Sequence, residues 1–268
     1  MDTLPAEILN EILIRVDRPS LYYASQVCVE WRKLSVKQVK MSETTEDFYY
    51  TCLLGDRLSV VKSKVNQQWI KNGFYAACEG GHKELVELII AKGADGWSGG
   101  LYNACLRGHK DIAKLMITKG ATNLDTGLHM ACRGGHKELA ELMITEGAKD
   151  FNGGLYRACQ EDYKELAELM IVKGADNLNG NLYDACLRGH KDIAKLMITK
   201  GANCWDDGLH GACEGGHKEL AELMIAKGAD NWNDGLYDAC CEGHKELAEL
   251  MIDKGANNCR CRKSITEH

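Results

Sequence analysis

Apolar positions recur along this chain in a pattern that repeats every 27 residues. In one copy, LYNACLRGHKDIAKLMITKGA at residues 101–121, the apolar side chains of Leu101, Ala104 and Cys105 share one face of a short helix. Gly108 suits the left-handed conformation that ends a helix, and a second apolar stripe follows it. The pattern predicts a pair of short amphipathic helices, neither of which can bury its apolar face alone.

The helix pair occurs many times in succession. Residues 48–56, FYYTCLLGD, resemble a degenerate first copy. Full units begin at Phe74, Leu101, Leu128, Leu155, Leu182, Leu209 and Leu236. A fixed period of about 20–50 residues is typical of solenoids, in which each unit buries its apolar face against its neighbours. We therefore expect an all-α repeat array over residues 48–259, with a short tail at 260–268.

The array also has a longer period of three units. Residues 101–121 and 182–202 differ at a single position, where Asn103 corresponds to Asp184. This similarity indicates that a block of three units was duplicated. Growth of this kind extends a surface without creating an active site, so it favours a binding protein over an enzyme.

The first 36 residues contain no copy of the repeat. Their apolar pattern predicts three helices, with Pro5 at the start of the first helix and a turn at residues 17–20. A segment shorter than about 40 residues cannot bury this much apolar surface by itself. We expect the remaining surface to bind a second protein.

Composition and charge restrict the classes of partner. The chain has 268 residues, 45% of them apolar and 27% charged, which is ordinary globular composition. A net charge of −6 argues against a nucleic-acid backbone as a partner. The sequence lacks both a run of ~20 apolar residues and a signal-peptide pattern, so we expect no membrane partner and an intracellular location, cytoplasmic or nuclear.

Seven cysteines recur once in each unit, always after alanine on the apolar face. They are Cys78, Cys105, Cys132, Cys159, Cys186, Cys213 and Cys240. Free cysteine in such a position behaves as a small buried apolar residue. The alternative, a metal or redox role, usually needs closely spaced pairs such as C-x-x-C, and the sequence has none. We expect buried thiols, no metal and no cofactor.

A histidine follows glycine at the same place in six units, and Tyr163 replaces it in the seventh. A catalytic histidine has no reason to be copied six times, so we expect a hydrogen bond that braces the loop. A role in proton transfer or metal binding would require a second converging ligand. The sequence contains no Ser-His-Asp order, no Gly-rich phosphate loop and no metal-ligand spacing, so catalytic residues are not expected.

The residues that vary between units lie on the first helix and in the loop after it. A constant scaffold around variable exposed positions is typical of a recognition surface, although drift at unconstrained positions would give the same pattern. The candidate target-binding residues are Ala76, Asn103, Arg107, Met130, Arg133, Arg157, Gln160, Asp184, Arg188 and Asp238.

A stripe of large apolar residues precedes the units. It consists of Trp97, Leu124, Phe151, Leu178, Trp205 and Trp232. We expect these residues in the loops, either wedged between neighbouring units or exposed as binding hot spots.

The repeated motif G-H-x-x-[IL]-[AV]-x-L-[MI]-I-x-x-G-A resembles the ankyrin repeat. Two departures from that family are evident. The usual Thr-Pro before Leu-His is absent, and the unit has 27 residues where the family norm is about 33. The missing residues fall where ankyrin repeats carry a projecting β-hairpin, so the resemblance implies short loops in its place.

An ordered set of mostly apolar residues begins with Leu4-Pro5 and ends with Trp31-Arg32. In this order, residues 1–38 resemble an F-box, and residues 39–47 would be a linker. The resemblance implies three helices that bind a Skp-family adaptor. The implied contacts are Leu4, Pro5, Ile8, Leu9, Ile12, Leu13 and Leu21, with Val27, Cys28 and Trp31 sharing the packing. Alternatively, these residues only pack against the first repeats.

Together the two resemblances imply a substrate-recognition subunit of an SCF-type cullin-RING ubiquitin ligase. The F-box would bind the adaptor and cullin complex, the repeats would bind a target protein, and other subunits would carry out catalysis. The alternative is a non-catalytic interaction or virion scaffold protein without coupling to a ligase. The combination also resembles proteins of large DNA viruses of amoebae, which would place the protein in a host cell.

Overall fold

The computed structural model describes Tyr49, Cys52, Leu53, Gly55 and residues 67–258. The predicted F-box at 1–38, the linker at 39–47 and the tail at 260–268 lie outside the described residues. Within the part that is described, the regular secondary structure is α-helical throughout, which confirms the predicted fold class. No helix in this part is long and apolar enough to cross a membrane.

The chain divides into two compact units, residues 1–147 and 148–268. The helices described in the first unit are α6 (Gln67–Gly80), α7 (Lys83–Ala91), α8 (Trp97–Arg107), α9 (Lys110–Thr118), α10 (Leu124–Arg133) and α11 (Lys137–Glu146). Those of the second are α12 (Phe151–Gln160), α13 (Lys164–Lys173), α14 (Leu178–Arg188), α15 (Lys191–Lys200), α16 (Trp205–Gly215), α17 (Lys218–Lys227), α18 (Trp232–Glu242) and α19 (Lys245–Lys254).

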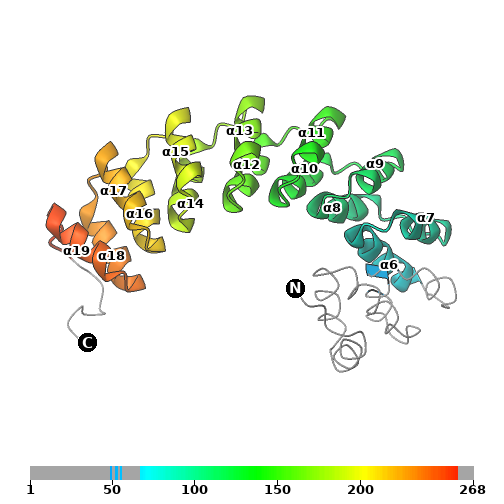
Figure 1. Ribbon diagram of the computed structural model, residues 1–268, viewed down its shortest axis with the longest axis horizontal. Helices are drawn as coiled ribbons and strands as arrows, with labels where there is room; N and C mark the ends of the chain where they lie inside the picture. Colours follow the sequence, from blue (N-terminus) through cyan, green and yellow to red (C-terminus); the bar gives the residue numbers. More distant parts are fainter. Residues whose placement is uncertain (1–48, 50–51, 54, 56–66, 259–268) are drawn as a thin grey trace, which may run out of the picture. The chain divides into compact units, whose positions relative to one another are not determined.

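Each repeat consists of a first helix, which carries an even number, and a second helix, which carries an odd number (Figure 1). Within each compact unit, a first helix packs against the second helix of its own repeat and against the first helix of the next repeat, as α14 does with α15 and α16. Leu101, Ala104 and Cys105 of α8 are fully buried, as are Ala113 and Met116 of α9. The 27-residue apolar pattern therefore marks the core of the array.

The first helices begin about one turn earlier than the sequence predicted. The stripe of large apolar residues does not lie in the loops, because each member opens a first helix, as Trp97 opens α8 and Trp232 opens α18. Glycine is common in loops, but the glycines that follow these residues lie inside the helices. Gly100 lies in close contact with the second helix, since a Cβ there would lie 2.7 Å from Met116 Sδ. The six members of the stripe are all half-buried.

Side chains near the start of the first helices hold the loops that replace β-hairpins. Asn152 Oδ1 accepts hydrogen bonds from the backbone N–H groups of Asp176 and Asn177, at 2.9 and 3.0 Å. Asn179, Asp206 and Asn233 make the same pair of bonds to the loops that follow them, at distances from 2.8 to 3.1 Å. These bonds satisfy loop backbone donors that a hairpin would otherwise pair, so a shorter repeat suffices.

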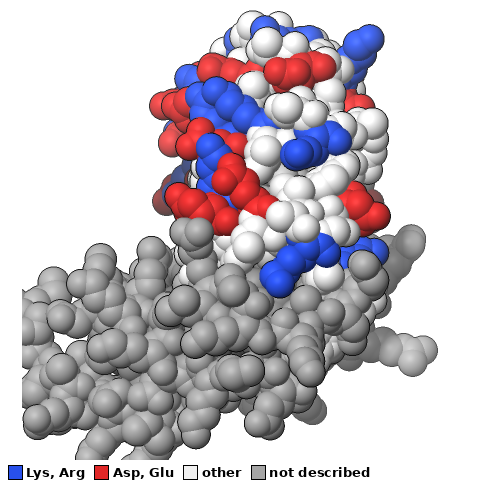
Figure 2. All heavy atoms as spheres, turned by 90° about the vertical axis from the view of Figure 1, so that its right-hand side faces the viewer, with Lys and Arg blue, Asp and Glu red and all other residues white. Residues whose placement is uncertain are grey.

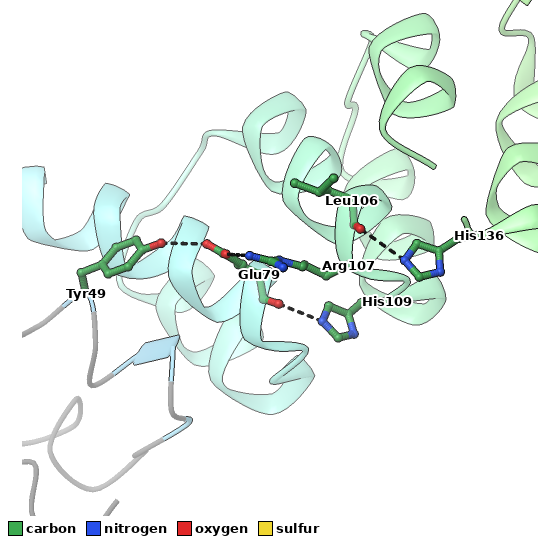
Figure 3. Close-up of polar contacts among 6 residues, drawn as sticks. All are labelled: Tyr49, Glu79, Leu106, Arg107, His109 and His136. Carbon is green, nitrogen blue, oxygen red and sulfur yellow. Dashed lines mark hydrogen bonds and ion pairs between the residues drawn. The ribbon is translucent and has the colours of Figure 1, made fainter. Parts of the chain in front are cut away.

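The Gly-His turn joins each repeat to the one before it. His109 Nε2 bonds the carbonyl oxygen of Glu79 at 2.8 Å, and His136 Nε2 bonds that of Leu106 at 3.2 Å (Figure 3). The glycine before the histidine has a positive φ, which is 78° at Gly81. A Cβ at Gly81 would lie 2.5 Å from the His109 ring, so glycine is favoured at this position for two reasons.

One turn lacks that glycine. Asp162 is the one residue other than glycine with a positive φ in the described part of the chain, at 61°. In the next repeat, His190 bonds the carbonyl oxygen of Cys159 through Nδ1 at 2.9 Å, whereas the other histidine bonds run through Nε2. The turned ring of His190 is consistent with the space that a Cβ occupies at position 162.

Replacing Asp162 with glycine should therefore stabilise the protein. The left-handed conformation costs an L-residue about 1–2 kcal/mol, and the greater freedom of unfolded glycine offsets part of this gain. We expect the free energy of unfolding in urea to rise by about 0.5–1 kcal/mol. Asp162→Asn keeps the Cβ and serves as the control, with little change expected. A loss of stability in the glycine variant would contradict this explanation.

Candidate functional site

The candidate target-binding residues occupy the first helices and the turns after them. Eight have side chains that are half-buried or exposed, namely Asn103, Arg107, Arg133, Arg157, Gln160, Asp184, Arg188 and Asp238. Ala76 and Met130 correct the expectation, because their exposures are 0% and 5%. Their position faces the preceding first helix, since a Cβ at the equivalent Gly211 would lie 2.6 Å from Tyr183 O. Alanine, methionine and glycine are buried at this position, and the polar residues there are half-buried.

Glu79 organises the first group of polar side chains (Figure 3). Its carboxylate accepts hydrogen bonds from the Tyr49 hydroxyl at 2.7 Å and from Arg107 Nη2 at 2.6 Å. Its carbonyl oxygen is the acceptor for His109. The Arg107 side chain is 46% exposed but already ion-paired, so a target would have to share it with Glu79.

Arg157 and Gln160 form a second group on α12. Arg157 Nη1 donates to Gln160 Oε1 at 2.9 Å, and Gln160 Nε2 donates to the Tyr156 hydroxyl at 2.6 Å. The Arg157 guanidinium also lies 5.4 Å from the centre of the Tyr156 ring. These contacts hold two sequence-predicted residues in one fixed arrangement on the surface.

The repeated histidines brace the fold, as the sequence predicted. His82, His109, His136, His190 and His244 each bond a backbone carbonyl oxygen of the preceding repeat. Burial lowers the pKa of His109 and of His217, which favours the neutral ring. A ring that is neutral and bonded to a carbonyl oxygen is suited to structural support.

The seven repeated cysteines are all buried, which confirms their assignment to the core. Burial raises the pKa of the thiols of Cys105, Cys132, Cys159, Cys186 and Cys213 to about 12. Thiols with such pKa values are protonated at neutral pH and react slowly. Within the described residues, no group of three or more His, Cys, Asp or Glu side chains is arranged to hold a metal ion.

Alkylation of the native protein should separate these cysteines from the more exposed ones. We expect iodoacetamide at neutral pH to label Cys204 and Cys241, which are half-buried, well before Cys105 or Cys186. Peptide mass spectrometry measures the labelling of each thiol, and denatured protein provides the fully labelled reference. Rapid native labelling of most of the repeated cysteines would contradict their burial.

A pocket of about 350 Å³ lies between α16 and α18, and most of its polar side chains are acidic. It is lined by Asp206, Asp207, His210, Asn231, Asp234, Gly235, Tyr237 and Asp238. Of these residues, the sequence analysis had named only Asp238 as a target-binding candidate. The sequence could have revealed the other acidic residues, because α16 and α18 each contain three acidic residues and no Lys or Arg.

Asp238 is the most perturbed carboxyl group in this pocket. Its side chain is 12% exposed, and its Oδ2 lies 3.3 Å from His210 Nε2. The pair is close enough for an ion pair when His210 is protonated, but Oδ2 is buried without a hydrogen bond of good geometry. Burial raises the pKa of Asp238 to about 6, with nearby Glu214 and Asp234 adding to the rise and His210 opposing it.

This pKa predicts a pH-dependent stability. Folding raises the Asp238 pKa from 3.8 to about 6, so the folded chain binds more protons than the unfolded chain between these values. The free energy of unfolding should therefore fall as the pH rises from about 4 to 6, and the loss should persist above 6. Asp238→Asn should be more stable than the parent at pH 7.5, with the difference shrinking towards pH 4. Urea unfolding at several pH values tests this, and a less stable variant at pH 7.5 would contradict it.

The second helices carry charges that pair between neighbouring repeats. In the second unit, Lys191 pairs with Glu219, and Lys218 pairs with Glu246 at 3.3 Å. On the face that Figure 2 displays, basic and acidic side chains likewise interleave. Exposed pairs of this kind contribute at most about 1 kcal/mol each to the free energy of unfolding.

Comparison with family models gives two matches. A model described as ankyrin repeats, in three copies, matches residues 74–152, 101–181, 128–208 and 182–261. A model described as an F-box domain matches residues 1–41. The ankyrin matches together span residues 74–261, more than half of the chain.

A solved structure similar to this chain is the crystal structure of the human ASB11 ankyrin repeat domain. The match has a TM-score of 0.50 and 23% sequence identity, and it covers 61% of this chain and 86% of the human chain. At this identity the similarity shows the fold alone. A comparison with curated proteins found none that matches.

Proposed function

The chain belongs to the ankyrin-repeat family, and from this premise we propose that it is the substrate-recognition subunit of an SCF-type cullin-RING ubiquitin ligase. The observation that carries the proposal is the presence of an F-box domain and ankyrin repeats on one chain. Both are typically non-catalytic modules of protein–protein interaction. Such a chain brings two proteins together, and other subunits catalyse ubiquitin transfer.

The F-box end of the proposal concerns residues 1–38. Their apolar side chains, such as Leu9, Ile12 and Trp31, would bind a Skp-family adaptor that leads to the cullin. These residues lie outside the described part of the structure. The support comes from the F-box match at residues 1–41 and from an apolar segment too short to form a core by itself.

The repeat end of the proposal concerns the first helices. The second helices are nearly identical between repeats, so they give a target little to distinguish. The first helices differ from one another, and they carry the partly exposed side chains of Arg157, Gln160 and Asp184. We therefore place target recognition on the first helices of residues 74–258.

Affinity purification of the tagged full chain from cells, with quantitative mass spectrometry of the bound proteins, tests the proposal. We expect a Skp-family adaptor and a cullin together with at least one further protein. Deleting residues 1–41 should remove the adaptor and cullin and leave the further protein bound. If the full chain retains partners but no adaptor, the chain is an interaction or scaffold protein without a ligase, and the proposal fails.

A further inference from the structure

Negative charge is concentrated on two of the first helices. α16 carries Asp206, Asp207 and Glu214, α18 carries Asp234, Asp238 and Glu242, and neither helix has a lysine or an arginine. The other first helices differ. α8 and α12 each carry one arginine and no acidic residue, and α10 and α14 each balance one arginine with one aspartate. Because all these helices perform the same structural role, the fold alone does not require α16 and α18 to be acidic.

The acidic side chains surround a cavity into which a side chain can enter. The 350 Å³ pocket between α16 and α18 is bordered by Asp206, Asp207, Asp234 and Asp238. A second pocket of about 490 Å³ is lined by Asn233, Asp234, Tyr237 and Asn258. Asp234 and Tyr237 line both, so the two hollows adjoin at these residues. Tyr237 is 44% exposed and offers an aromatic surface beside the carboxylates.

A buried carboxylate oxygen in this pocket lacks a well-placed donor. Asp238 lines the pocket, and its Oδ2 is enclosed by protein without a hydrogen bond of good geometry. The nearest basic group is His210 Nε2 at 3.3 Å, on a side chain that is itself 48% exposed. A cationic N–H group that enters the pocket would pair with the carboxylates that line it and would offset the repulsion between them.

We propose that the surface formed by α16 and α18 binds a basic protein segment, with an arginine or lysine side chain of that segment inserted between Asp206, Asp234 and Asp238. The proposal names the class of target for the recognition role proposed above and rests on that role. A guanidinium or ammonium group would pair with the carboxylates and lie against the Tyr237 ring. No set of three side chains suited to a metal ion is present in the described residues, so a cationic side chain fits better than a bare ion.

Three of the negative charges can be removed by substitutions that keep the hydrogen-bond acceptors on which the loops depend. Asp206 Oδ1 accepts the loop hydrogen bonds of Asp230 and Asn231, a task that asparagine performs at positions 152 and 179. The variant Asp206→Asn/Asp207→Asn/Asp234→Asn therefore keeps these acceptors and removes three charges. The matched control Glu168→Gln/Glu222→Gln/Glu249→Gln removes three charges from second helices of the same unit.

The experiment measures binding of a fluorescein-labelled peptide of alternating arginine and serine to the full-length protein, by fluorescence anisotropy. The reference peptide carries citrulline in place of arginine. We expect the arginine peptide to bind the parent and the Glu→Gln control equally, and the Asp→Asn variant about tenfold more weakly. Binding should weaken with added salt, because partly exposed charges are screened. Thermal unfolding of each variant confirms that it is folded.

Two results would overturn the inference. One is equal binding of the arginine and citrulline peptides by the parent protein. The other is an equal loss of binding in the Asp→Asn variant and the Glu→Gln control, which would show attraction to net charge alone. Either result, obtained with a chain that still captures its adaptor and target from cells, removes this inference and leaves the proposed function standing. If the chain binds the peptide as expected but captures no adaptor from cells, the proposed ligase function fails and the basic-segment site remains.

Discussion

Replacing Leu9 and Ile12 with glutamate should abolish binding of a Skp-family adaptor. Under the proposed function, both side chains lie in an apolar interface that excludes water. Burying an unpaired carboxylate there costs several kcal/mol, which corresponds to more than about a hundredfold in the dissociation constant. Calorimetric titration of the purified full chain with adaptor measures the effect.

The matched control changes the polar face of the same predicted helix. Asn10→Glu/Arg15→Gln alters the net charge by the same amount as Leu9→Glu/Ile12→Glu but leaves the apolar positions intact. We expect the control to bind adaptor like the parent. Equal binding by all three proteins would show that these apolar residues pack within the chain instead, and would remove the adaptor contact from the proposal.

The second large effect is expected where α14 and α16 pack most closely. A Cβ at Gly211 would lie 2.6 Å from Tyr183 O, and a Cβ at Gly215 would overlap Leu187 O. Backbone oxygens cannot move away as a flexible side chain can, so the helices would have to separate. Overpacking costs about 1–3 kcal/mol per site, while Gly→Ala in a helix gains up to about 1 kcal/mol. For Gly211→Ala/Gly215→Ala we expect a net loss of about 2 kcal/mol.

The control for this prediction lies on the neighbouring helix. Gly180 on α14 is exposed, and a Cβ there would meet only the side chain of Asn177, at 2.9 Å. Gly180→Ala should therefore leave the free energy of unfolding unchanged or raise it. Urea unfolding of the parent, the double variant and Gly180→Ala measures the effect. A general effect of Gly→Ala would change both variants in the same direction, whereas overpacking would destabilise only Gly211→Ala/Gly215→Ala.

The sequence predicted the parts of the fold that depend on repetition. The 27-residue period identified the helix pairs, the buried cysteines and the bracing role of the histidines. These predictions hold because each repeat presents the same side chains to the same neighbours. A position that departs from the pattern in one repeat is outweighed by the matching positions in the other repeats, so the apolar pattern predicts the fold reliably.

Features that depend on exact distances between helices were not predictable from the pattern. Glycine is common in loops, and the close approach of Gly100 to Met116 becomes apparent only in three dimensions. Met130 was expected at the surface because it occupies a variable position, but that position also faces a neighbouring helix, so an apolar side chain is buried there.

The candidate site was predicted only in part for a similar reason. Asp238 was chosen because it varies between repeats, whereas Asp206 and Asp234 were missed because they occupy different positions in their own repeats. α16 and α18 bring all three to one pocket. A comparison of the net charges of the first helices, in addition to the comparison of single positions, would have identified α16 and α18 as acidic from the sequence.

The central claim is that one chain holds an adaptor and a target at the same time. Sequential purification tests it most directly, first through a tag on the Skp-family adaptor and then through a tag on the protein captured by the repeats. The account predicts that the captured protein survives both steps only when the full chain is present, and that Leu9→Glu/Ile12→Glu removes it. Recovery of the captured protein on the adaptor without the chain, or its absence with the full chain present, would contradict the account.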